Sequence, residues 1–175
     1  MRVVGGLYRG RKLASFEGQE VRPTADRVKE NLFNIIGNRI IGAQFLDVFG
    51  GTGAIGIEAL SRGAEKVTVL DFSEKSVALI NKNFKNLNIN QTAVKTDSLS
   101  FLKRGGKYDI IFIDPPYASD LGVKSLQIIG EDGLLKDNGF AIFEHEEPFA
   151  LQVNGLTVFD ERKYGRVYLT FFKRS

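Results

Sequence analysis

Residues 45–56 read Phe45-Leu46-Asp47-Val48-Phe49-Gly50-Gly51-Thr52-Gly53-Ala54-Ile55-Gly56, an apolar run followed by a glycine-rich loop. The apolar run predicts a buried strand. The glycines let the backbone turn sharply into a helix and approach a ligand closely. Residues 51–56 match the pattern G-x-G-x-x-G, and Asp71 follows 20 residues after Gly51, at the end of the next predicted strand. An acid there can bind ribose hydroxyls, so the stretch indicates a nucleotide-type cofactor in an α/β fold.

Strand and helix patterns alternate over the rest of the chain. A small β-hairpin unit is expected over residues 1–22, and a helix from about Pro23 to Gly37. Strands that alternate with helices imply right-handed crossovers and a mainly parallel, doubly wound sheet. We therefore expect one compact α/β unit with strands at 45–49, 66–70, 93–95, 108–113 and 140–143 and a closing antiparallel pair at 153–159 and 166–172.

Composition excludes several classes of function. The chain has 175 residues, a length typical of one domain, and 43% apolar residues, as in ordinary globular proteins. It contains no cysteine and one histidine, so a disulfide framework, a thiolate zinc site and a histidine metal cluster are all excluded. We expect no metal cofactor. With neither a signal peptide nor a membrane-spanning apolar stretch in the sequence, a cytoplasmic protein is expected.

The second motif, Asp114-Pro115-Pro116-Tyr117, follows the apolar run 110–113. It is expected at the carboxyl end of a strand, where ligands bind in open α/β sheets. Two prolines remove two backbone donors, so the corner offers a carboxylate and carbonyls that only accept hydrogen bonds, beside a flat tyrosine ring. Such a corner suits a planar group that bears N–H, such as a nucleobase amine. An ordinary strand-to-loop turn is the alternative.

The acid within the first strand distinguishes between cofactors. Asp47 precedes the glycine loop, where it would repel a pyrophosphate but attract the ammonium and sulfonium of S-adenosylmethionine. Hydride transfer also has no evident use for the Asp-Pro-Pro-Tyr motif. S-adenosylmethionine is therefore favoured over a nicotinamide cofactor, while a helix or loop cap is the structural alternative for Asp47.

Together these motifs resemble class I S-adenosylmethionine-dependent methyltransferases that act on exocyclic amines, which have a Rossmann-like seven-stranded sheet with an antiparallel last strand. The sequence is most similar to the bacterial small-subunit (16S) ribosomal RNA guanine-N2 methyltransferase family. This resemblance covers nearly the whole chain and includes Gly10-Arg11-Lys12-Leu13, Arg22-Pro23-Thr24, Asp26-Arg27-Val28-Lys29-Glu30, Leu32-Phe33-Asn34 and Glu58-Ala59-Leu60-Ser61-Arg62-Gly63-Ala64. The family's usual Ala-Gly-Ser-Gly loop is here replaced by residues 50–53.

The resemblance implies roles for individual residues. Asp71 would bind the ribose, Phe72 would pack on the adenine, and Asp97 with the Ser98 amide would recognise the adenine edge. Asp114 and the Pro115 carbonyl would accept the two N–H groups of the guanine amine, and Tyr117 would stack on the base. The methionine moiety would be held by Asp47, Phe49, Gly50, Gly51 and Gly53, and the catalytic motif would comprise Asp114, Pro115, Pro116 and Tyr117.

The amino-terminal block carries an excess of positive charge. Residues 1–12 contain four basic residues and no acid, so we expect residues 1–37 to bind RNA phosphates and residues 38–175 to form the methyltransferase domain. Generic surface charge is the alternative for any single cation. The expected partner is 16S ribosomal RNA, within the small subunit or its assembly intermediate, and the protein is expected to be a monomer. The candidate RNA contacts are Arg2, Arg9, Arg11, Lys12, Arg22, Arg27 and Lys29.

Three other functions remain open from the sequence. A DNA adenine-N6 methyltransferase would use the same Asp-Pro-Pro-Tyr motif, although the chain has no room for a separate target-recognition domain. A nicotinamide-dependent oxidoreductase would use the literal glycine pattern. A non-catalytic RNA-binding domain would retain only the remains of a cofactor pocket, which the complete set Asp47, Asp71, Asp97 and Asp114 argues against.

Overall fold

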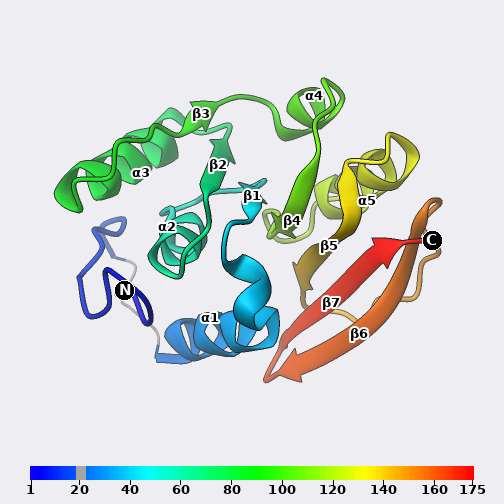
Figure 1. Cartoon of the computed structure of the whole chain (residues 1–175), viewed down its shortest axis with the longest axis horizontal. Helices are drawn as coiled ribbons and strands as arrows, with labels where there is room; N and C mark the ends of the chain where they lie inside the picture. The colour runs from blue at the N-terminus through cyan, green and yellow to red at the C-terminus, as the bar shows by residue number, and fades with distance from the viewer. Residues whose placement is uncertain (19–22) are drawn as a thin grey trace.

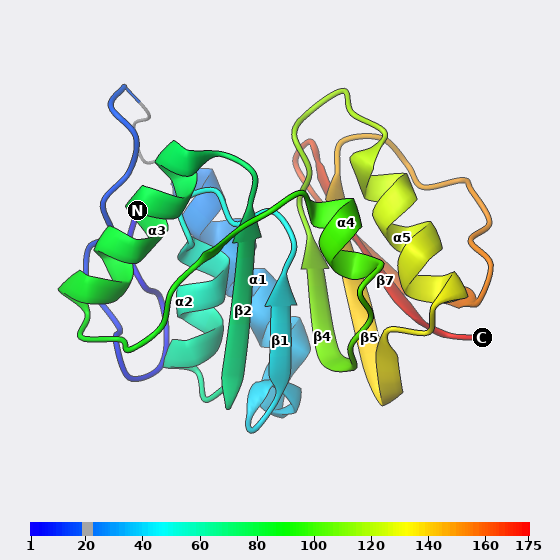
Figure 2. The same cartoon turned by 90° about the horizontal axis from the view of Figure 1, so that it is seen from above.

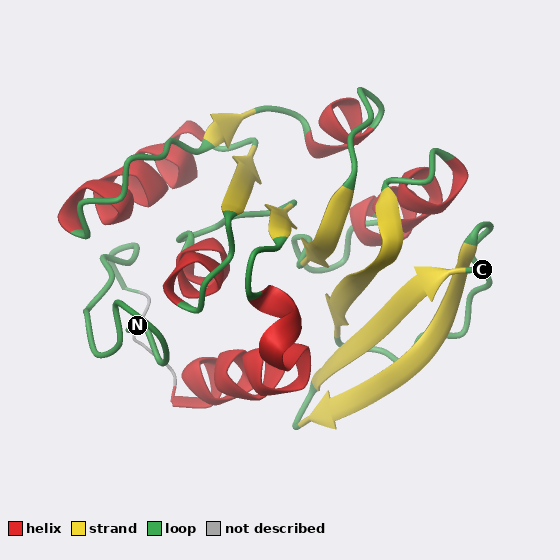
Figure 3. Ribbon diagram, viewed as in Figure 1, coloured by secondary structure: helices red, strands yellow, loops and turns green. Residues whose placement is uncertain are grey.

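The computed structural model describes residues 1–18 and 23–175, which form a seven-stranded sheet between two layers of helices (Figures 1 and 3). The strand order is β3-β2-β1-β4-β5-β7-β6, and β7 runs antiparallel to both of its neighbours. The elements are α1 (Pro23–Ile36), a 3-10 turn (Gly37–Ile40), β1 (Gln44–Asp47), α2 (Ala54–Ser61), β2 (Lys66–Asp71), α3 (Glu74–Asn86), β3 (Val94–Lys95), α4 (Ser98–Leu102), β4 (Tyr108–Ile113), α5 (Leu121–Glu131), β5 (Leu135–His145), β6 (Leu156–Tyr164) and β7 (Val167–Arg174).

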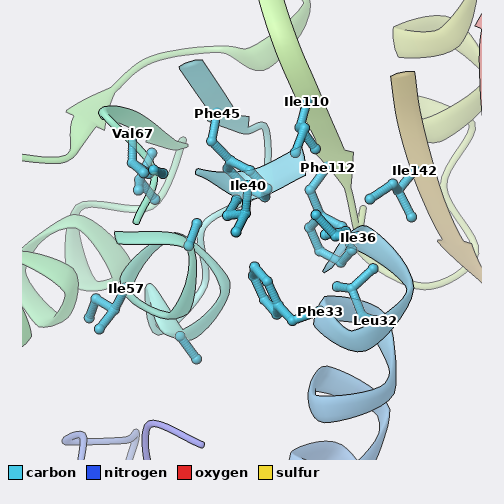
Figure 4. Packing of buried hydrophobic residues seen from close by; sticks show 14 of the residues in the cluster. Leu32, Phe33, Ile36, Ile40, Phe45, Ile57, Val67, Ile110, Phe112 and Ile142 are labelled. Carbon is cyan, nitrogen blue, oxygen red and sulfur yellow. The ribbon is translucent and has the colours of Figure 1, made fainter. Parts of the chain in front are cut away.

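The two faces of the sheet bury separate apolar clusters. Viewed from above, β2, β1 and β4 point the same way (Figure 2). Successive side chains of a strand point to opposite faces. One face packs against α1, α2 and α3, and the other against α4 and α5. Figure 4 shows Phe33 and Ile36 of α1 near Phe112 of β4, with Ile142 of β5 beside them. Helix α1 therefore covers the centre of the sheet on this face.

The expected mainly parallel, doubly wound sheet is confirmed, with differences at its margins. β5 extends over Leu135–His145, whereas residues 140–143 were expected, and β6 over Leu156–Tyr164, whereas 153–159 were expected. The charged residues 160–163 stay in β6 because this strand lies at the sheet edge and pairs only with β7, so its side chains reach solvent. Among the described residues, no helix is both long and apolar enough to cross a membrane.

The amino-terminal segment forms a short hairpin-like pairing. One antiparallel bridge joins Arg2 and Lys12, and backbone hydrogen bonds run from Val3 N to Arg11 O, from Gly10 N to Val3 O and from Leu13 N to Met1 O, at 2.9 to 3.0 Å. Beyond this pairing, the amides of Val4 and Gly5 donate to the buried carboxylate of Glu58 on α2, at 2.9 and 2.7 Å. The segment is thereby fixed to the helix that follows the glycine loop.

Candidate functional site

Asp47 is the last residue of β1 and lies on the α1 face of the sheet. Its side chain is 1% exposed, and neither carboxylate oxygen makes a hydrogen bond of normal geometry with a described residue. Burial raises the pKa of Asp47 well above its usual range, and the nearby charge of Asp114 raises it further, while the amides of Gly56 and Phe49 lower it slightly. Asp47 is thus a buried carboxyl group without a partner, which fits a site for a cationic ligand group.

The glycine loop is shaped by close packing. A Cβ added to Gly50 would lie 2.4 Å from Val69 Cγ1, and one added to Gly53 would lie 2.9 Å from Ile80 Cγ2, so both positions exclude side chains. Gly51 has φ of +56° and open space on its Cβ side. The loop can therefore pack tightly against β2 and α3 while leaving its outer side free for a ligand.

Asp71 ends β2 and holds the loop in place. Its Oδ2 accepts a hydrogen bond from the amide of Gly51 at 2.9 Å, and its Oδ1 accepts one from the amide of Ser73 at 2.8 Å. Each carboxylate oxygen has a second lone pair, so further acceptor capacity remains for a ligand hydroxyl. Phe72, the next residue, is 78% exposed and presents its ring to solvent.

Asp97 and Ser98, the two residues predicted to recognise the adenine edge, lie at the start of α4. Asp97 is the N-cap residue, and its Oδ1 accepts a hydrogen bond from the Ser100 amide at 2.8 Å. The Ser100 hydroxyl and, to a smaller extent, its amide lower the pKa of Asp97. Ser98 is buried in the first turn of the helix.

Asp114 follows β4, next to β1 in the sheet. Although solvent reaches the side chain, surrounding protein atoms displace much of the water and raise the pKa of Asp114 to about 7. The following turn is closed by Ser119, whose hydroxyl donates to the Pro116 carbonyl at 2.7 Å. Tyr117 is 77% exposed, so a flat ring stands beside the carboxyl group.

A further acid, Glu144, was not among the candidates from the sequence. It lies near the carboxyl end of β5, and burial together with the charge of Asp114 raises its pKa to about 8. The signal that could have identified it is the one used for Asp114, an acid directly after the apolar run 140–143 of a predicted strand.

Several of these groups line a pocket of about 460 Å³. The pocket brings together the glycine loop, the acids Asp114 and Glu144, α1, Tyr164 at the end of β6 and Arg166 in the turn that follows. The predicted catalytic and cofactor-binding residues that do not line it are Asp47, Gly53, Asp71, Phe72, Asp97, Ser98, Pro115 and Pro116. Its lining residues include Met1, Asp26, Lys29, Phe49, Gly50, Gly51, Asp114, Tyr117, Glu144, Glu146, Tyr164 and Arg166.

The candidate RNA contacts divide into two groups. Lys29 is 4% exposed; its Nζ donates to the Arg2 carbonyl at 2.6 Å and lies 3.4 Å from Glu58. It is therefore a buried structural cation rather than a surface contact, and we remove it from the RNA candidates. Arg22 lies outside the described residues. Exposed side chains are found at Arg2, Arg9, Arg11, Lys12 and Arg27.

Comparisons with known proteins agree with this geometry. The family model described as Conserved hypothetical protein 95 matches residues 1–173. The chain is 35% identical to YlbH of Bacillus subtilis, provisionally named as an rRNA methyltransferase, over 99% of each chain. It is 37% identical to ribosomal RNA small subunit methyltransferase D of Haemophilus influenzae, over 84% of this chain and 79% of the other. A solved Escherichia coli structure, yhhF, provisionally described as a methyltransferase, superimposes with a TM-score of 0.88 at 34% identity, covering 100% of this chain and 98% of that one.

The resemblance seen in the sequence is thus confirmed at the level of the family. The chain belongs to the Conserved hypothetical protein 95 family.

Proposed function

We propose that the protein transfers a methyl group from S-adenosylmethionine to the exocyclic N2 amine of a guanine in 16S ribosomal RNA. The relative of Haemophilus influenzae named for small-subunit ribosomal RNA supports this class of substrate. The observation that carries the proposal is the proximity of two acids at adjacent strand ends. Asp47 is buried without a partner, and Asp114 stands in an acceptor-only corner near enough for its charge to raise the pKa of Asp47.

The residues at the strand ends fit the cofactor. Bound S-adenosylmethionine would supply an electrophilic methyl carbon on a sulfonium. Asp47 would face a cationic group of the cofactor, which would restore its ionised form. The loop residues Phe49, Gly50, Gly51 and Gly53 would hold the methionine moiety, Asp71 the ribose, Phe72 the adenine face, and Asp97 with Ser98 the adenine edge.

The acceptor corner would position the amine. The N2 lone pair of guanine is delocalised into the ring, so the amine is a poor nucleophile. Asp114 and the Pro115 carbonyl would accept its two N–H groups and aim the lone pair at the methyl carbon, while Pro116 keeps the corner rigid. The N–C bond forms as the C–S bond breaks, the bonding electron pair stays on sulfur, and Asp114 takes the N2 proton. Such proton transfer contributes roughly 10²- to 10⁴-fold in rate.

The target base must leave its stack to enter the pocket. Tyr117, whose ring is exposed beside Asp114, would then stack on it, which contributes about 1–3 kcal/mol. Residues 1–37 would bind the surrounding RNA through the exposed Arg2, Arg9, Arg11, Lys12 and Arg27. Met1 and Asp26 line the same pocket, so this extension would present RNA at its mouth.

The test is to incubate the protein with S-adenosylmethionine labelled in the methyl group and small ribosomal subunits that lack the modification. Nuclease digestion and mass spectrometry then identify the labelled nucleoside. N2-methylguanosine in 16S RNA is the expected product. Label at adenine N6 would refute the proposal. It would also be refuted if a parallel assay with DNA alone gave labelled product, or if no methyl transfer occurred and spectroscopic titration showed binding of NADH.

A further inference from the structure

We infer that Glu144 accepts a hydrogen bond from the N1–H of the target guanine and thereby selects guanine over bases that lack this donor. The inference rests on the proposed function and assigns a specificity-determining residue to the same site. It follows from where the sheet places Glu144, from its chemical environment, and from the donor pattern of guanine.

The register of the sheet places Glu144 on the same face as the other two acids. Asp47 pairs with Phe112 of β4, and Phe112 pairs with Ile142 of β5. Two residues beyond that level, Asp114 comes directly after β4 and Glu144 lies within β5, and residues two apart on a strand point to the same face. Asp114 and Glu144 therefore stand side by side on the α1 face of the sheet, two residues beyond the level of Asp47 at the end of β1.

Glu144 and Asp114 line the same pocket, and their charges interact. Both line the 460 Å³ pocket, and the charge of Asp114 is one cause of the raised pKa of Glu144. Among the described residues, none makes an ion pair or side-chain hydrogen bond with the carboxyl group of Glu144. The other charged or titratable described residues that line this pocket are the amino-terminal Met1, Asp26 and Lys29 on α1, Tyr117 after β4, Glu146 after β5, Tyr164 at the end of β6 and Arg166 after it.

Guanine offers two neighbouring donor groups to such a pair. Its N2 amine and its N1–H lie side by side on one edge, so one carboxyl group can receive N2–H while the next receives N1–H. Adenine and 2,6-diaminopurine have a lone pair at N1, which an ionised Glu144 would repel. Since hydrogen bonds to charged groups are the stronger ones, we expect a preference for guanine of roughly 10- to 100-fold.

The experiment uses ligated small-subunit RNA that carries either guanine or 2,6-diaminopurine at the mapped position. Both bases have the N2 amine, but only guanine has N1–H. The ratio of kcat/KM for the two RNAs is measured at pH 8.5, where Glu144, with a pKa of about 8, is mostly ionised and most of the guanine keeps its N1–H. The wild-type protein should prefer guanine by the factor above. In Glu144→Gln the ratio should fall toward one, because the amide can turn its N–H toward N1 of diaminopurine.

Glu147→Gln is the matched control, since Glu147 is an exposed acid three residues further along the chain and does not line the pocket. It should keep the wild-type ratio. A second measurement needs no variant: in the wild type the ratio should fall from pH 8.5 to pH 6.5, because protonated Glu144 can donate to N1 of diaminopurine. The ratio cancels the effect of Asp114 titration that both substrates share.

The outcomes separate the two proposals. An active wild-type protein whose ratio stays constant with pH, or a cofactor-binding Glu144→Gln variant with the wild-type ratio, would overturn the assignment of Glu144 alone. Failure of the wild-type protein to methylate N2 of the guanine RNA would overturn the proposed function, and the assignment with it.

Discussion

Replacing Glu58 by Gln tests how the amino-terminal segment is held on the cofactor-loop helix. Glu58 is fully buried on α2. Its carboxylate accepts hydrogen bonds from the amides of Val4 and Gly5, at 2.9 and 2.7 Å, and pairs with Arg62 at 2.8 Å and Lys29 at 3.4 Å. Glutamine keeps the shape of the side chain but removes its charge and one acceptor.

The expected loss follows from these partners. The single amide oxygen can satisfy one of the two backbone N–H groups, and leaving the other unpaired costs about 1–3 kcal/mol. The buried ammonium of Lys29 also loses its closest fully buried anion, and breaking a buried pair on one side typically costs about 3–5 kcal/mol in all. Because Arg62 is partly exposed and can turn to water, we expect the free energy of unfolding to fall by about 3 kcal/mol.

Lys29→Met is the matched comparison. Burial is the largest influence on the pKa of Lys29 and lowers it, so its charge is poorly compensated where it lies. A methionine of similar length should cost about 1–2 kcal/mol, less than Glu58→Gln, because the Arg2 carbonyl loses its donor while Glu58 keeps Arg62 and two backbone amides. In the double variant with Glu58→Gln, the loss should be smaller than the two single losses added together.

Urea unfolding at pH 7 measures all three variants, and limited trypsin digestion after Arg9 and Arg11 reports release of the segment. Glu58→Gln should be cleaved faster there than the wild type. The reasoning is refuted if Glu58→Gln loses less than about 1 kcal/mol, or if Lys29→Met is as destabilising as Glu58→Gln.

Three further predictions concern the site. Asp114→Ala should lower methyl transfer by at least about 10²-fold while calorimetry finds unchanged S-adenosylmethionine binding; full activity would remove its role. Asp47→Asn should weaken cofactor binding yet stabilise the free protein at neutral pH, because the raised pKa of Asp47 in the folded state opposes ionisation there. This gain in the free energy of unfolding should vanish below about pH 4, where the carboxyl group of Asp47 is protonated in both the folded and the unfolded protein. A loss of stability of Asp47→Asn at neutral pH would contradict this prediction. The triple replacement of Arg9, Arg11 and Lys12 by Ala should reduce the slope of log affinity for RNA against log salt by about 2, and an unchanged slope would exclude phosphate contacts there.

The glycine loop and the Asp-Pro-Pro-Tyr corner could be predicted because their chemistry is contiguous in the sequence. Glycines, prolines and a preceding apolar run define the local backbone without reference to the rest of the chain. Glu144 carries only half of that signal, since no proline follows it and the next residue is His145. Its importance depends on the register between β4 and β5, which places it beside Asp114, and the sequence does not specify that register.

Lys29 shows the opposite error. Its charge within the basic amino-terminal block favoured an RNA contact, but α2 brings the buried Glu58 against it and the amino-terminal segment covers both. A burying contact between residues 29 positions apart in the chain leaves no local pattern. The charged end of β6 was missed for a related reason, because edge position depends on strand order.

The protein surrounds its perturbed acids in two different ways, and the contrast bears on function. Around Glu58 the chain itself supplies two amides and two cations, so the carboxylate is compensated within the folded structure. Asp47, Asp114 and Glu144 receive no ion-pair partner from the described residues, and all three have raised pKa values. Three acids without an ion-pair partner among the described residues, on adjacent strand ends and in or beside one pocket, fit the proposed function, in which a cationic group of the cofactor would face Asp47 and N–H donors of the base would face the other two.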